Sequence, residues 1–191
     1  QNVTILEIMG RNAGWLTGAA ALAKGEDCEG PDMLFLPEVT FDVDSFMKKV
    51  EELHKKKASV VVAVSEGVKL ADGRDVCELT DGIEFVDAFG HKQLTGTARF
   101  LAEKVNREVG CKTRAIEFNS LQRCASHIVS RVDITEAFQV GGAAVKEAFE
   151  GETGKMVILK RVSDDPYVCV TDIYDVHKVA NVEKKGPREW I

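Results

Sequence analysis

The sequence lacks any apolar run long enough to cross a bilayer. A membrane helix needs about 18 or more consecutive apolar residues, and no stretch of this chain approaches that length. The first residues also lack the basic and apolar regions of a signal peptide. We therefore expect a soluble, cytoplasmic protein with no membrane partner.

An excess of positive charge is also missing. The 25 lysines and arginines stand against 31 aspartates and glutamates, which gives a net charge of -6. Such a chain has no basic field to attract a polyanionic duplex, so we expect no nucleic acid partner. The composition is 45% hydrophobic over 191 residues, which is enough for a core.

Cysteine and histidine show no ligand spacing. The five cysteines are odd in number and form no C-x-x-C pair, and the four histidines are scattered. We expect reduced thiols and no metal site within this chain. The sequence also contains neither a Walker loop nor a G-x-G-x-x-G turn.

Short apolar runs instead alternate with segments of helical period. Strands are predicted at 3–9, 33–36, 59–64 and 113–118, with helices at 13–24, 43–56 and 93–109 between them. This alternation predicts an α/β fold with a doubly wound, mostly parallel sheet and helices on both faces. Residues 67–90 show no sustained period and are predicted to be a long excursion outside the core.

The last part of the chain has a different pattern. It predicts a helix at 133–149 and two strands at 156–162 and 167–173, with a turn between the strands. A Gly141-Gly142 pair within the helix indicates close packing there, because glycine otherwise weakens a helix.

In parallel sheets, ligands bind beyond the carboxyl ends of the strands. The turn after the first strand contains Gly10, which lets backbone approach a ligand, and Arg11, a fixed cation. Backbone amides at the start of the next helix would point outward, which suits an anion or sugar hydroxyls. A packing turn with a solvated arginine remains an equal alternative.

Acidic residues follow or flank the apolar strands. Glu66 and Gly67 end the valine-rich strand, where a carboxylate can bind hydroxyls or simply face solvent. Glu7 and Glu38 are unusual acids beside apolar runs, and either could orient an arginine or a metal-bound water.

Two arginines lie nine residues apart near the fourth strand. Arg114 and Arg123 flank short polar side chains, and paired guanidinium groups suit a phosphate dianion. Surface salt bridges are the alternative.

Several strings together resemble the phosphofructokinases in order, identity and spacing. They are Glu7-Ile-Met-Gly-Arg-Asn-Ala-Gly-Trp15, Leu36-Pro-Glu38, Val64-Ser-Glu-Gly67 and the stretch from Arg114 to Leu121-Gln-Arg123. The resemblance extends from the first residue to at least Lys160. It is closest to the diphosphate-dependent branch, because Gln122-Arg123-Cys124-Ala125-Ser126 is similar to that branch.

The resemblance implies roles for individual residues. Met9, Gly10 and Arg11 match the fructose 6-phosphate loop, and Arg11 also matches a catalytic arginine that steadies charge on the transferring phosphoryl group. Glu66 matches the acid that binds sugar hydroxyls. Arg123 matches an arginine on the 6-phosphate.

Two further matches concern the phosphate. Arg114 matches an arginine that reaches the phosphate of a neighbouring subunit, which implies a homo-oligomer. The segment Ser120, Leu121, Gln122 and Arg123 matches the rest of the phosphate loop. Ser120 departs from the family, which commonly has histidine or tyrosine there, so Asn119 or a water would have to substitute.

The family's first half has no counterpart in this chain. The Gly-Gly-Asp donor loop and the Thr-Ile-Asp-Asn-Asp segment are both missing. The resemblance therefore implies a sugar-phosphate-binding α/β domain at 1–121 and a segment at 122–191 that crosses back to a donor domain and ends in a C-terminal tail. The donor (diphosphate or ATP), the Mg²⁺ ligands and the base would come from the missing half.

The function expected from this resemblance is phosphoryl transfer to the C1 hydroxyl of fructose 6-phosphate in glycolysis. The isolated chain is expected to be inactive. The alternatives are an ATP-dependent 6-phosphofructokinase and a non-catalytic regulatory module that binds sugar phosphates.

Overall fold

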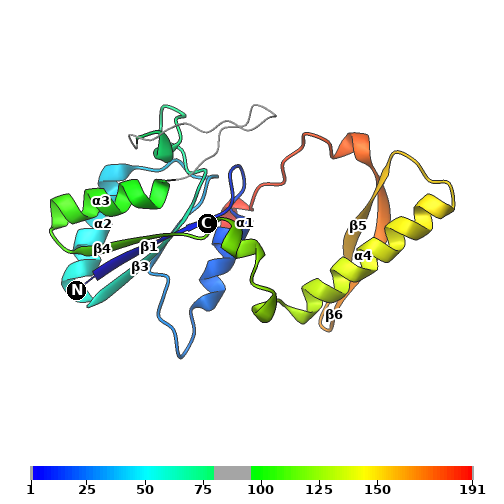
Figure 1. The fold of residues 1–191 in the computed structure, drawn as a ribbon, viewed down its shortest axis with the longest axis horizontal. Coiled ribbons are helices and arrows are strands. Elements are labelled where there is room, and N and C mark those ends of the chain that lie inside the picture. The colour runs from blue at the N-terminus through cyan, green and yellow to red at the C-terminus, as the bar shows by residue number, and fades with distance from the viewer. Residues whose placement is uncertain (1, 80–95, 191) are drawn as a thin grey trace. The chain divides into compact units, whose positions relative to one another are not determined.

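A computed structural model describes residues 2–79 and 96–190 (Figure 1). The chain divides into two compact units. One comprises Gln1–Cys124 together with Lys184–Ile191, and the other comprises Ala125–Glu183. The tail from Lys184 onward thus groups with the first unit and not with the rest of 122–191.

The first unit is built on a four-stranded sheet with the order β2-β3-β1-β4. Its strands are β1 (Asn2–Ile8), β2 (Met33–Phe35), β3 (Ser59–Ser65) and β4 (Lys112–Glu117). Every pairing is parallel. The alternation of strand and helix in the sequence requires this arrangement, because a helix must carry the chain back before a parallel strand can begin. The predicted parallel α/β sheet is confirmed.

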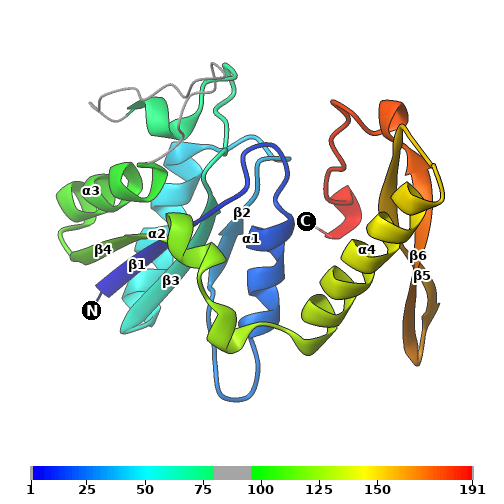
Figure 2. The same cartoon turned by 45° about the vertical axis from the view of Figure 1, so that its right-hand side comes forward.

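Helices lie on both faces of the sheet. α2 (Val43–Lys56) and α3 (Thr97–Val109) share one face, where their apolar side chains join one cluster with those of β1 and β3. α1 (Trp15–Ala19) lies near β2 and β3 (Figure 2). Its Thr17 forms a buried hydrogen bond with Ser65 at 2.6 Å. Since Ser65 alternates with Val64, this contact places α1 on the opposite face.

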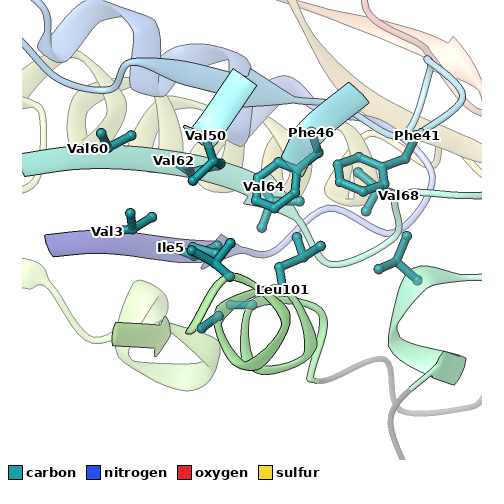
Figure 3. Close-up of a cluster of buried hydrophobic side chains, with 14 of the residues drawn as sticks. Val3, Ile5, Phe41, Phe46, Val50, Val60, Val62, Val64, Val68 and Leu101 are labelled. Carbon is teal, nitrogen blue, oxygen red and sulfur yellow. The ribbon is translucent and has the colours of Figure 1, made fainter. Parts of the chain in front are cut away.

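The core of this unit forms between the sheet and the α2 and α3 helices. Val3 and Ile5 of β1 and Val60, Val62 and Val64 of β3 meet Phe46 of α2 and Leu101 of α3 (Figure 3). All seven side chains are fully buried. Asp42 begins α2 by accepting a hydrogen bond from the backbone of Ser45 at 2.6 Å. The strands that lead to the carboxyl edge of the sheet are therefore held in place by this core.

The first helix and the excursion differ from expectation. The helix predicted at 13–24 is α-helical only over Trp15–Ala19 and continues as a 3₁₀ turn over Ala20–Ala23. Only Thr17 of α1 is buried, so little packing supports a longer α-helix. The excursion at 67–90 is predicted to lie outside the core. Two of its residues, Val68 and Val76, are instead fully buried in the core of this unit. Residues 80–90 of that excursion lie outside the described residues, as do 93–95 of the next predicted helix.

The second unit contains α4 (Arg131–Phe149) and a hairpin of β5 (Lys155–Asp164) and β6 (Tyr167–Asp175). The hairpin is antiparallel, as the turn between its strands predicts. Short 3₁₀ turns occupy η4 (Ser126–Ile128) and η5 (Val176–Lys178), while η3 (Asn119–Arg123) and η6 (Arg188–Trp190) belong to the first unit.

This second unit has no buried core. None of the residues 125–183 is buried. One side of α4 carries four exposed apolar side chains at helical spacing, namely Ile134, Phe138, Val145 and Phe149. The prediction of close packing at Gly141 and Gly142 is wrong for the described residues, since a Cβ at either position would meet nothing within 4 Å. No helix in the described ranges is long and apolar enough to span a membrane.

Candidate functional site

The turn that follows β1 lies at the carboxyl edge of the sheet and meets two other segments there. The Met9 amide donates to Oε1 of Gln122 at 3.1 Å. The Gly10 amide donates to Oε1 of Glu66 at 3.2 Å. Because the carboxyl ends of parallel strands meet at one edge, the ends of β1, β3 and β4 bring these residues together from distant positions in the sequence.

A third side chain holds the far end of the same turn. Glu38 follows β2, and its carboxylate accepts the Gly14 amide at 2.9 Å to Oε1 and 3.1 Å to Oε2. The amides of Met9, Gly10 and Gly14 therefore donate to protein side chains. The expectation that the amides of this turn face a ligand is wrong for these three. These three amides are therefore not available to an anion at this edge.

Glycine is required where two of these segments cross. A Cβ on Gly67 would lie 1.8 Å from the backbone oxygen of Arg11, closer than any real contact. A Cβ on Gly10 would lie 2.8 Å from the Ala13 oxygen and 3.1 Å from Oγ of Ser65. The backbone after β3 thus packs directly on the backbone of the turn, and this contact places Glu66 beside Arg11.

Glu66 is fixed through its backbone as well as its side chain. Its amide donates to the Ile8 oxygen at 3.0 Å, and its own carbonyl accepts from Oγ1 of Thr97 at 3.3 Å. Glu66 and Arg11 are both half-buried. The Glu66 carboxylate binds Gly10, the residue before Arg11, and a carboxylate and a guanidinium on such adjoining segments can bind hydroxyl groups and an anion of one ligand.

Arg123 follows Gln122, whose side chain binds the Met9 amide, whereas Arg114 lies further from the turn. Arg123 ends η3, one residue after Gln122, and is exposed. Arg114 pairs with Thr4 in the middle of the sheet. Met9 follows Thr4 by five residues, or about 16 Å at the usual rise of a strand. The structure therefore does not bring Arg114 together with the other predicted site residues of the same chain.

The segment between the two arginines is open. Ser120 and Leu121 are both exposed, and Leu121 is 71% exposed. Asn119 has a φ of 42°, a left-handed conformation that asparagine tolerates better than most residues. This residue turns the chain from β4 into η3 and so sets the direction in which Gln122 and Arg123 point.

Glu7 and Glu38 bind backbone amides, which sequence reasoning missed. Glu7 is 3% exposed, and its Oε2 accepts from the Ala98 amide at 2.7 Å at the start of α3. Burial, reinforced by the nearby charges of Glu117 and Glu66, raises its pKa to about 7 against the lowering effect of the Ala98 amide. Oε1 of Glu7 is buried without a hydrogen-bond partner.

The pKa of Glu38 is lowered, in contrast to that of Glu7. Burial acts to raise the pKa of Glu38, but the amides of Gly14 and Gly186 stabilise the carboxylate and bring the pKa below its usual value. The only signal in the sequence was an acid placed beside an apolar strand. The amides that it would bind are 24 and 148 residues away.

Metal ligands are not grouped here. Within 2–79 and 96–190, no cluster of three or more histidine, cysteine, aspartate or glutamate side chains could hold a metal ion. The site can bind and orient an anionic, hydroxyl-bearing ligand.

Known proteins share both the sequence and the fold. Residues 1–148 match the profile of the family described as phosphofructokinase. The chain is 39% identical over 189 residues to the pyrophosphate-fructose 6-phosphate 1-phosphotransferase of Halomonas elongata, covering 99% of this chain and 44% of that protein. The corresponding Xanthomonas campestris protein is 40% identical over the same length and coverage.

The solved structures agree. The pyrophosphate-dependent phosphofructokinase from Marinobacter aquaeolei superimposes with a TM-score of 0.80 at 32% identity, covering 99% of this chain and 43% of that chain. The present chain thus spans less than half the length of these relatives. The match over three quarters of the sequence, together with the shared fold, shows that the chain belongs to the phosphofructokinase family.

Proposed function

We propose that this chain is the fructose 6-phosphate-binding portion of a 6-phosphofructokinase that takes its phosphoryl group from diphosphate. The observation that carries the proposal is the identity of about 40% to two pyrophosphate-fructose 6-phosphate 1-phosphotransferases across almost the whole chain. The geometry agrees with it, since Glu66 and Arg11 lie together at the edge of a rigid sheet. The same relatives favour diphosphate over ATP as the donor.

In this proposal, the site residues bind different parts of the ligand. Glu66 accepts hydrogen bonds from sugar hydroxyls, and Met9 and Gly10 form the wall of the pocket. Arg123 binds the 6-phosphate with the help of the segment Ser120–Gln122. Arg11 stabilises charge that develops on the transferring phosphoryl group.

Arg114 serves a neighbouring copy of the chain. Its position in the middle of β4, on the face opposite α3, leaves it exposed and distant from its own turn. Ile116, two residues further on the same face, is 41% exposed. A second copy packed on this face would bring Arg114 to a phosphate bound by the partner, so the active form is a homo-oligomer.

The remaining chemistry lies outside this chain. Phosphoryl transfer needs a bound donor, Mg²⁺ and a base for the C1 hydroxyl proton. We assign these to the part of the relatives' length that this chain does not span. The segment 122–183 returns to that donor domain, whose surface would cover the exposed stripe of α4. The isolated chain is then inactive, and the whole enzyme acts in the glycolysis of the cytoplasm.

Calorimetric titration with fructose 6-phosphate tests the proposal. We expect weak binding by the wild-type chain and a further loss of about 1.5 to 3 kcal/mol for Arg123→Ala, because a charge-assisted contact is removed. Arg107→Ala, an exposed arginine at the end of α3, is the matched control and should leave the affinity unchanged. Equal affinities for the wild type and Arg123→Ala would contradict the assignment.

A further inference from the structure

The C-terminal tail is attached to the carboxylate that holds the substrate turn. The Gly186 amide donates to Oε1 of Glu38 at 2.9 Å. The same oxygen accepts the Gly14 amide at 2.9 Å. One carboxylate therefore joins the end of the turn, the segment after β2 and the tail.

Trp15, the residue after Gly14, holds the tail through a second contact. Nε1 of Trp15 donates to the Lys184 oxygen at 2.6 Å, and the Lys184 ammonium lies 5.9 Å from the centre of the Trp15 ring. Trp15 is the first residue of α1 and directly follows Gly14. The tail is thus held at two points, by the Glu38 carboxylate and by the Trp15 side chain.

Both amides reach Glu38 because both residues are glycines. A Cβ on Gly14 would lie 2.8 Å from Leu36 and 3.0 Å from Oε2 of Glu38. A Cβ on Gly186 would lie 3.3 Å from Oε1 of Glu38. The carboxylate is therefore enclosed closely by backbone on two sides, and little room remains for either segment to shift without breaking its hydrogen bond.

We call the pair of hydrogen bonds from Gly14 and Gly186 to Glu38 the tie. The tie fixes one of the two ends of the turn. Glu66 holds Gly10 at one end and Glu38 holds Gly14 at the other. Arg11 lies between these two fixed points. Its backbone position therefore depends on both carboxylates, although Glu38 itself contacts the far end of the turn and not the residues assigned to the ligand.

We propose that Glu38 is a positioning residue that couples the C-terminal tail to the fructose 6-phosphate turn, so that the seating of the tail sets the placement of Arg11. The inference rests on the proposed function for its ligand. It goes beyond the family match, which ends at residue 148 and does not include the tail. The chain that follows in a longer protein would act on substrate affinity through this tie.

Fructose 6-phosphate titration of three variants of the full chain tests the coupling. Glu38→Ala and deletion of residues 184–191 should each weaken binding by about tenfold, which corresponds to about 1.4 kcal/mol. Glu38→Gln should stay within about threefold of the wild type, because one oxygen can still accept both amides. Glu52→Ala, an exposed glutamate of α2, is the control.

The two changes should not add. If the tail acts through Glu38, deletion of residues 184–191 from the Glu38→Ala variant should cost much less than the same deletion costs in the wild-type chain. Additive losses, or an affinity for Glu38→Ala equal to that of Glu52→Ala, would overturn the proposal.

Amide hydrogen exchange tests this proposal independently of the proposed function. Glu38→Ala should speed exchange at both Gly14 and Gly186, whether or not the chain binds the sugar phosphate. Unchanged protection at Gly186 overturns the tie. A wild-type chain that shows the tie but binds no fructose 6-phosphate contradicts the proposed function instead.

Discussion

Single residues decide how closely the segments of the site approach. Gly67 is the sharpest case, because its backbone packs on that of Arg11. Glu7 is the second, because a carboxylate stands where the two preceding core-facing residues of β1, Val3 and Ile5, are apolar. Each leads to a prediction with a different measurement.

Gly67→Ala should destabilise the fold and abolish binding of fructose 6-phosphate. The new methyl group would overlap backbone atoms of Arg11, and backbone cannot move away as a side chain can. Thermal unfolding and calorimetric titration measure the two effects. Gly18→Ala is the control, since its Cβ meets nothing within 4 Å and alanine favours a helix by up to about 1 kcal/mol. A normal melting temperature and normal binding for Gly67→Ala would contradict this packing.

Glu7→Gln should remove a pH dependence of the free energy of unfolding. The folded state raises the pKa of Glu7 from 4.5 to about 7, so it binds more protons than the unfolded state between these values. The wild-type chain should therefore lose stability as the pH rises through this window, by about 3 kcal/mol at most. Urea unfolding at pH 5 and pH 8 measures the slope. Equal slopes in the wild type and Glu7→Gln would show that Glu7 ionises as an exposed acid does.

Residue identity alone could predict part of the site. The glycines and Arg11 marked the turn after the first strand, and Glu66 marked the end of the third strand. The partners of the turn amides could not be read from the sequence. They depend on Glu38 and Gln122, which reach the turn only after the sheet has formed.

At the scale of elements, apolar period predicted the well-packed segments best. The strands β1 and β3 and the helices α2 and α3 each contribute buried side chains to the core, so pattern and packing agree, whereas the edge strand β4 has no buried residue. α1 is shorter than predicted because almost nothing in it is buried. The apolar stripe of α4 is the opposite case, because its side chains remain exposed in their own unit.

The stripe on α4 should cause the isolated chain to self-associate. Phe138 and Phe149 are 83% and 93% exposed, and large apolar patches of this kind associate in water. The double change Phe138→Ser and Phe149→Ser should lower the association seen by sedimentation velocity, while Val182→Ser, an exposed apolar residue outside the stripe, should not. A wild-type chain that remains monomeric at high concentration would contradict this prediction.

For the whole molecule, the separation of the arginines predicts complementation between copies. In an oligomer, a site would use Arg123 of its own chain and Arg114 of a partner. Arg114→Ala and Arg123→Ala should each lose fructose 6-phosphate binding. Co-refolding the two variants should restore about one quarter of the sites, because half of randomly formed dimers are mixed and each has one complete site. Binding measured by calorimetry checks the count, and no recovery would place both arginines in one chain's site.

The division of the whole chain was the least predictable property. The family resemblance implied a boundary after residue 121, but the tail at 184–191 rejoins the first unit, where it contacts Glu38 and Trp15. Such a return depends on a few hydrogen bonds between residues far apart in the chain, which leave no period in the sequence.

Because Asn119–Leu121 are exposed, this segment is the place at which to change which sugar phosphate the site accepts. The turn glycines Gly10 and Gly14 have little freedom to vary, because a Cβ at either position would meet neighbouring atoms at 2.8 Å. Ser120, by contrast, is exposed and small and lies three residues before Arg123 in η3. A library that randomises this one position would sample new sugar esters while sparing the scaffold.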